Sequence, residues 1–263
     1  MKEVLLITVF LISLLLTSCN TKSALEHKEA ENVVVTEPPV SSAAPIEEQK
    51  TEEKPVLAVQ DIENVYEIQI GDTVTFGTYN GLPLEWYVID TNDNAVLLLT
   101  RYVLTDMKFT SQYDLRNLTG TEGIWAYSDI REWLNGDFYN SSFSESEKSK
   151  IIKKALSTTY YDKDKNELKS ETEDFVFVPD PNEAMDIDIN MRKGVPTEVA
   201  NLSDAESFAM GNKRWWTRGP NANYKGADPG YVAYVSSQGD VNLFVPDYEE
   251  TGVRAEIWVK IGD

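Results

Sequence analysis

"SDIREWLNGDFYNSSFSESEKSKI", residues 128–151, is the most clearly helical text in a chain that otherwise alternates like β-strand. Ser128 can cap a helix with Ile130, Trp133 and Leu134 on one face. Asn135–Gly136 predicts the end of that helix, because glycine disfavours a helix interior and favours its C-terminal boundary.

A second helix follows directly. Ser144 with Glu147 three residues later forms a capping box, which predicts a helix that begins here and extends to about Lys154. Its inward face would consist of Ile151, Ile152 and Ala155.

The text on both sides of these helices predicts strands. On the N-terminal side, residues 66–79 contain strand, turn and strand, and residues 84–100 form a hairpin around Thr-Asn-Asp-Asn. On the C-terminal side, the predicted strands are two around a charged loop within 155–179, then "WWTR", "YVAYVSS", "VNLFV" and a closing strand "GVRAEIWVKI". A short helix is predicted at "NEAMDIDI". Strands, then two short consecutive helices, then strands indicate a single α+β domain with antiparallel sheets.

The N-terminus has the features of an export signal. Residues 4–16 are almost entirely apolar, but too few to span a bilayer comfortably. They lead into Leu16-Thr17-Ser18-Cys19, which resembles the bacterial lipobox. That resemblance implies that residues 1–19 are a signal peptide and that Cys19 is lipidated. The protein is then anchored to the cell membrane by lipid, on the extracytoplasmic face; an ordinary signal peptide with an incidental cysteine is the alternative.

Residues 20–62 predict a disordered acidic tether. They are rich in Glu, Lys, Ala, Ser and Pro, contain no aromatic residue, and cannot bury enough apolar surface to offset chain entropy. The folded domain is therefore expected at 63–263, with its first strand near Val65. The chain carries a net charge of −20, which excludes a nucleic-acid partner because such a surface repels phosphate.

Several blocks of the domain carry a family resemblance. In order they are "GDTVTFGTY", "LEWYVID", "AVLLLTRYVL", residues 128–151, "FVFVPDPNEA", "PTEVA", "WWTRGP" and "GVRAEIWV". From about Gly71 to Trp258 they resemble DUF6273, an uncharacterised domain of Gram-positive, Firmicutes-type bacteria that is often carried by lipoproteins. This chain departs from the family text at Thr217 and Gly219, where that text has Leu and Ser, and at Ala255–Glu256, which replaces Pro-Ala.

A second resemblance is to the C-type-lectin-like and sulfatase-modifying-enzyme folds. It implies a loop-rich face that presents a ligand. The catalytic form of that fold uses a redox pair of cysteines, and the expected domain has none, so no activity is carried over.

The expected domain also has no histidine, since His27 and Cys19 are the single representatives of their types. This removes Ser-His-Asp and Cys-His triads, histidine zinc sites and thiol chemistry. Two carboxylates could still hydrolyse a glycoside, but no acidic pair stands out by spacing. We therefore assign no catalytic residue.

"KRWWTRGPN", residues 213–221, is the candidate ligand-binding segment. Trp215 and Trp216 could stack on a sugar or a peptide while Arg214 or Arg218 binds hydroxyls or a carboxylate. The alternative is that one indole packs in the core and the other lies under a loop or against the helices. Adjacent strand residues face opposite sides, so both can be buried only if both faces of the strand are covered.

A calcium site is the one metal hypothesis. Asp162, Asp164, Asn166 and Glu173 occupy ligand positions 1, 3, 5 and 12 of an EF-hand loop, but Glu167 replaces the required glycine. A solvated hairpin loop is the alternative.

The sequence thus predicts an extracytoplasmic lipoprotein with a non-catalytic domain for an envelope glycan or peptide. The alternatives are a carboxylate-dependent hydrolase acting on cell wall or glycan, and a structural module with a protein partner.

Overall fold

The computed structural model describes residues 56–63, 67–114, 121–197, 211–220 and 230–262. All of them belong to one unit of the chain, Glu52–Asp263. Cys19 and most of the expected tether lie outside the described residues. The described part is α+β with mostly antiparallel sheets, which confirms the predicted fold class.

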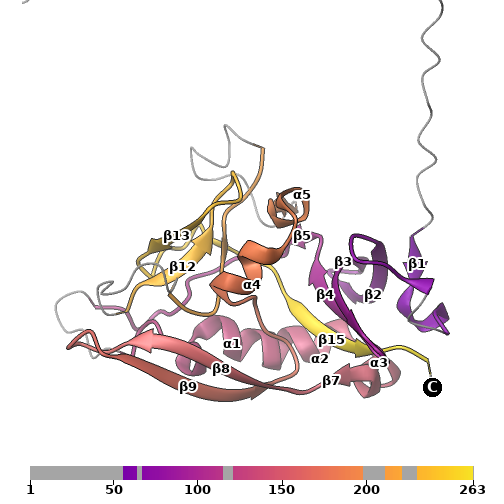
Figure 1. The fold of residues 1–263 in the computed structure, drawn as a ribbon, viewed down its shortest axis with the longest axis horizontal. Helices are drawn as coiled ribbons and strands as arrows, with labels where there is room; N and C mark the ends of the chain where they lie inside the picture. The colour runs from indigo at the N-terminus through magenta and orange to yellow at the C-terminus, as the bar shows by residue number, and fades with distance from the viewer. Residues whose placement is uncertain (1–55, 64–66, 115–120, 198–210, 221–229, 263) are drawn as a thin grey trace, which may run out of the picture. The chain divides into compact units, whose positions relative to one another are not determined.

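A six-stranded sheet has the order β1-β2-β3-β4-β15-β7. Its strands are β1 (Leu57–Ala58), β2 (Thr73–Tyr79), β3 (Leu82–Asn92), β4 (Ala95–Thr100), β15 (Glu256–Lys260) and β7 (Ile151–Ile152). β1 runs parallel to β2, and the other neighbours are antiparallel. The predicted hairpin is β3–β4. Figure 1 shows β15, which comes last in the chain, beside β4 rather than at the edge of the sheet.

The first predicted helix begins where expected but does not end where expected. The Ser128 hydroxyl accepts from the amide of Arg131 and caps α1 (Asp129–Trp133). The helix then continues through a π-helical turn, η4 (Leu134–Phe138), into α2 (Tyr139–Ser142). The predicted end at Asn135–Gly136 is therefore wrong. Burial of the Phe138 ring, which is 1% exposed, outweighs the cost of about 1 kcal/mol for an internal glycine.

The second helix, α3 (Glu145–Lys150), has the predicted capping box. The Glu147 carboxylate also accepts from the amide of Gly77 in β2. The predicted extension to Lys154 is wrong, because Ile151 and Ile152 form β7 and pair with β15. β-branched residues fit a pleated strand better than a helix end.

A five-stranded sheet has the order β13-β12-β11-β14-β6. Its strands are β13 (Val241–Phe244), β12 (Val232–Val235), β11 (Trp215–Trp216), β14 (Gly252–Val253) and β6 (Thr105–Asp106). The single closing strand predicted for "GVRAEIWVKI" is thus two strands. β14 belongs to the five-stranded sheet and β15 to the six-stranded sheet, and Arg254–Ala255 connects them.

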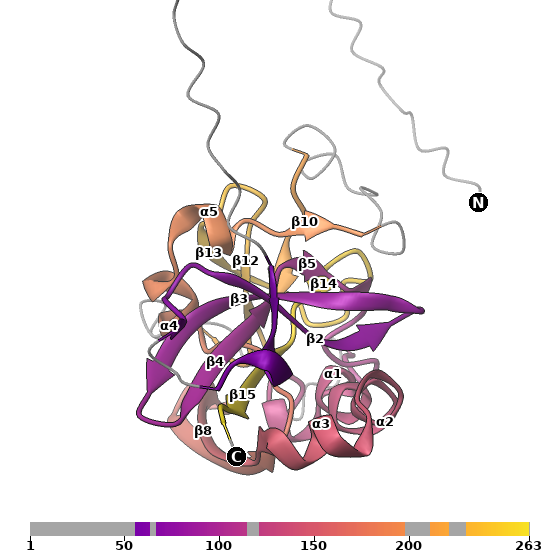
Figure 2. The ribbon, with the colours of Figure 1, turned by 90° about the vertical axis from the view of Figure 1, so that its right-hand side faces the viewer.

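The remaining elements include the predicted hairpin around a charged loop, β8 (Lys154–Tyr161) and β9 (Glu167–Asp174), and the predicted short helix, α4 (Pro181–Asp186). The others are η1 (Val59–Asp61), η3 (Trp125–Tyr127), α5 (Ile189–Arg192), and β10 (Val195–Pro196) parallel to β5 (Tyr102–Val103). Figure 2 shows α4 and α5 on one side of β3 and β4, and α1 and α2 on the other side.

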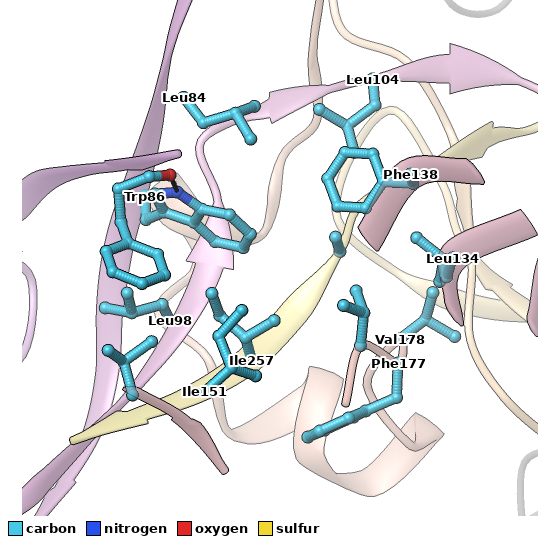
Figure 3. Close-up of a cluster of buried hydrophobic side chains, with 14 of the residues drawn as sticks. Leu84, Trp86, Leu98, Leu104, Leu134, Phe138, Ile151, Phe177, Val178 and Ile257 are labelled. Atoms are coloured by element: carbon cyan, nitrogen blue, oxygen red, sulfur yellow. Dashed lines mark hydrogen bonds between the residues drawn. The ribbon is translucent and has the colours of Figure 1, made fainter. Parts of the chain in front are cut away.

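The main core lies between the six-stranded sheet and the α1–α2 helix (Figure 3). Leu98 and Ile257 face Leu134 and Phe138 across this layer, and the Trp86 indole donates to the Phe76 carbonyl at 2.7 Å. Val59 and Ile62 are 0% and 2% exposed in the same core, so the fold includes residues before the expected start at 63. No helix in the described ranges has both the length and the apolar character needed to cross a membrane.

Two polar side chains connect the continuous helix Asp129–Ser142, called the long helix below, to the end of β9 and the residues that follow it. The Asn135 amide donates to the carbonyls of Arg131 and Val176 and accepts from the amides of Phe175 and Val176. The Asp174 carboxylate accepts from three side-chain donors: the Trp125 indole, Arg131 and the Thr172 hydroxyl. These bonds satisfy polar groups that would otherwise be buried without partners.

Candidate functional site

The two tryptophans of the candidate segment form β11, in the middle of the five-stranded sheet. Trp215 packs with Val103, Ala184 and the inner residues of β12, whereas Trp216 packs into the main core on the opposite face. Both are 0% exposed. Their indole N–H groups donate to the carbonyls of Arg192 and Met107, at 2.9 and 2.8 Å.

This arrangement favours burial over an exposed platform, but it differs from the predicted alternative, because both indoles are core residues. Both faces of the strand are covered, which is the condition under which adjacent strand residues can both be buried. An indole stacked against a ligand would need an open face, and neither ring has one.

Arg214, at the start of the segment, is buried among three aromatic rings. Its guanidinium carbon lies 4.6 Å from the centre of the Tyr248 ring, 5.8 Å from Phe244 and 6.0 Å from Tyr234. Tyr248 in turn donates to Glu250 at 2.9 Å. The rings are half-buried while Arg214 is 8% exposed. We refer to Arg214, Tyr234, Phe244 and Tyr248 as the Arg214 cluster.

Arg218 lies in a different environment. It donates to the Val178 carbonyl at 2.8 Å and forms an ion pair of 2.6 Å with Glu183 of α4. Its side chain is 5% exposed. The four predicted site residues therefore do not form one site: two indoles are core, Arg214 faces the aromatic rings, and Arg218 holds α4.

Arg254, which sequence reasoning did not single out, is fully buried. Its guanidinium donates to the carbonyls of Thr100 and Met191 and lies 5.2 Å from the Trp215 ring centre. Burial lowers the pKa of Arg254 to about 9, so the group is still charged at neutral pH. The signal that could have revealed it is an arginine between two apolar strand segments.

Glu256 was also missed. It is 0% exposed, and neither carboxylate oxygen has a hydrogen-bond partner among the described residues. Burial raises the pKa of Glu256 well above its ordinary value, and the nearby charges of Glu183 and Asp180 raise it further. Burial also raises the pKa of Asp180. For Glu183 burial is the largest influence and acts in the same direction, but the hydrogen bond and charge of Arg218, with the Asp180 amide, together lower the pKa.

These acids bear on the hydrolase hypothesis, which requires two carboxylates that face a substrate cleft. Glu183 and Glu256 differ in the direction of their pKa shifts, as an acid and a base would. Glu256 is closed off from solvent, however, so a substrate could not reach the pair in this conformation.

The calcium candidates are spread along the β8–β9 hairpin. Asp162 accepts from the amides of Asp164 and Asn166 and from the Asn166 side chain, so its oxygens shape the loop. Glu173 pairs with Ala155 near the other end of the hairpin and binds Lys153 at 3.0 Å. The flanking elements are strands rather than helices. Across the described ranges, no group of three or more acidic, histidine or cysteine side chains is placed to hold a metal.

For the third hypothesis, a protein partner, the relevant feature is exposed apolar surface. Met185 of α4 is 49% exposed and Ile189 of α5 is 38% exposed. Arg192 approaches the Met185 sulfur at 3.5 Å, so charge borders this surface.

Comparison with known families gives one match. A family model described as "Domain of unknown function (DUF6273)" matches residues 93–261, which includes β4, the α1–α2 helix, all of the five-stranded sheet and β15. No curated protein matches the chain, and no solved structure matches it.

Proposed function

The chain belongs to the DUF6273 family, and from that premise we propose that it is a lipid-anchored extracytoplasmic protein whose domain binds an envelope glycan or peptide without changing it chemically. The anchor rests on the sequence, in which an apolar segment ends at Leu16-Thr17-Ser18-Cys19 and an acidic, Pro-containing segment follows. A lipid is the attachment that suits a chain with a net charge of −20, since anionic headgroups repel it.

The Arg214 cluster is the observation that supports binding. Tyr234 and Asn242 are directly paired on β12 and β13, and Phe244 lies on the same face of the sheet. These half-buried aromatic rings, beside an amide, a guanidinium and the Glu250 carboxylate, offer both stacking edges and hydrogen-bonding groups. Such a surface suits a pyranose ring or an aromatic or acidic peptide side chain.

A non-catalytic role is supported by how three polar residues of the region matched by the family model are used. Asn135, Asp174 and Arg254 each bond to backbone or side-chain groups inside the fold. Residues with internal partners hold elements together, and the expected domain has neither histidine nor cysteine for general acid–base or nucleophilic work.

A binding experiment tests this role. The chain with Cys19→Ser would be applied to glycan and peptide arrays, and the best ligand titrated against Tyr234→Ala and Phe244→Ala. We expect each substitution to raise the Kd by roughly tenfold, about 1.4 kcal/mol, because a stacking face is lost. Tyr127→Ala is the matched control, since Tyr127 is 65% exposed and lies on η3.

Equal Kd values for all of these proteins would place binding elsewhere. Release of a cleavage product from the ligand would contradict the non-catalytic role. Melting curves for each variant distinguish a lost contact from a lost fold.

The anchor has its own test. Cells expressing the full chain and fed an alkyne fatty acid are expected to label the protein, and Cys19→Ser is expected to abolish the label and release the protein from the membrane fraction. Labelling that survives Cys19→Ser would contradict lipidation at this residue.

A further inference from the structure

Glu256 is paired through its backbone on both sides, so it lies in the interior of the six-stranded sheet. It begins β15, pairs with Leu99 of β4 on one side and exchanges two backbone hydrogen bonds with Phe177 on the other. Ile257 and Val259 face the main core, so Glu256 faces the opposite side of the sheet, toward α4. Its main chain is thus held by backbone on both sides, and its carboxyl group is buried without a hydrogen-bond partner among the described residues.

The charged groups that face it come from three elements. Asp180 and Glu183 belong to the start of α4, Arg218 follows β11, and Asp90 lies in β3. Arg218 is the one cation in this set. Burial and the three acids all favour the protonated form of Glu256, and Arg218 alone in this set opposes it.

Arg218 has a donor to spare. One terminal nitrogen serves both Glu183 and the Val178 carbonyl, whereas the Nε–H group is buried and has no partner among the described residues. Glu256 has two unpartnered oxygens, and its charge interacts with that of Arg218. The fold therefore places an unused guanidinium donor and two unused carboxyl oxygens in one buried cluster.

We propose that Arg218 is shared between two carboxylates and that proton loss from Glu256 draws the guanidinium away from Glu183, which loosens α4. An ionised carboxylate in the interior is costly without a counter-ion, and Arg218 supplies one. Glu183 would then keep its bond to the Asp180 amide but lose its link to the rest of the fold. The cap at Asp180, the buried Pro181 and Ala184, and the bonds from Arg192 to the Ala184 and Met185 carbonyls are attachments that remain.

The sign of the pH effect follows from linkage. Between the ordinary pKa of Glu256 and its raised folded value, the folded state carries a proton that the unfolded state has lost. Stability from this group is full below the ordinary pKa and falls as pH rises. Within that interval the unfolding constant is expected to increase about tenfold per pH unit.

The test compares the full chain carrying Cys19→Ser with the same chain carrying Glu256→Gln. Urea unfolding from pH 5 to 9 should show that the free energy of unfolding of the parent falls as pH rises. The Glu256→Gln chain should not show this fall. Hydrogen exchange, corrected for the intrinsic rate, should show α4 protection falling with pH in the first and constant in the second. Glu173→Gln, at an exposed glutamate on β9, is the matched control and should behave as the parent chain.

Glu183→Gln distinguishes the movement of Arg218 between two carboxylates from the effect of burying Glu256 alone. It should retain the pH dependence of unfolding but lose the pH dependence of α4 protection, because Arg218 no longer has two carboxylates to choose between. Identical pH profiles for the parent and Glu256→Gln would overturn the proposal. Should Glu256→Gln fail to fold, the infrared band of a protonated carboxyl in the parent at pH 7 decides the matter, and its absence overturns the proposal equally.

Discussion

Replacing Asp174 with alanine is expected to lower the free energy of unfolding by about 3–5 kcal/mol. The side chain is 0% exposed and accepts from the Trp125 indole at 2.9 Å, from Arg131 at 2.7 Å and from the Thr172 hydroxyl at 2.7 Å. Without the carboxylate, the cation loses its counter-charge and the buried indole N–H loses its acceptor. The connection between η3, the long helix and β9 is lost in the same step.

The measurement is urea unfolding at neutral pH. Glu171→Ala is the matched control, since Glu171 lies on the same strand, is exposed, and bonds to the Ser157 hydroxyl at 2.6 Å. It should change stability by less than about 0.5 kcal/mol. If Asp174→Ala costs no more than its control, the three contacts do not hold these elements together.

Replacing Trp216 with alanine is expected to cost about 3–5 kcal/mol, with a similar loss for Trp215. Each ring is fully buried, and each substitution leaves a cavity and removes the indole donor from the carbonyl of Met107 or of Arg192. The milder Trp→Phe changes keep most of the volume and lose the indole hydrogen bond.

Acrylamide quenching of the phenylalanine variants checks the burial directly. Neither Trp215→Phe nor Trp216→Phe should remove a quenchable component of the fluorescence. Trp258→Phe should remove one, because Trp258 is half-buried. A quenchable component that disappears with Trp216 while the melting temperature holds would mean that this indole is exposed, and would restore the platform interpretation.

The elements that the sequence predicts correctly are those with local signals. Ser128 and the Ser144–Glu147 pair cap helices through bonds within three residues, and the β3–β4 hairpin depends on its own turn. The incorrect boundaries depend on distant partners. The helix continues past Gly136 because the Phe138 ring packs in the main core. Ile151–Ile152 form a strand because they pair with β15.

The candidate site was harder to predict from the sequence, because its environment also depends on residues that are distant in the chain. Strand alternation correctly separates Trp215 from Trp216, but it cannot say what covers each face. Alternation likewise places Glu256 with Lys260 on the outer side of β15, where a glutamate is ordinary. Only the fold shows that Arg218 and α4 cover the Glu256 side of the strand.

The position of β15 has a consequence for how the protein reaches its folded state. Arg254, which precedes β15, bonds to Thr100, 154 residues earlier in the chain. Contacts this distant in sequence form late, because a long loop must close before they contribute. The six-stranded sheet therefore cannot close during synthesis until the last strand has emerged. A chain that completes its sheet so late leaves β4 and β7 without the strand that joins them until synthesis is nearly finished.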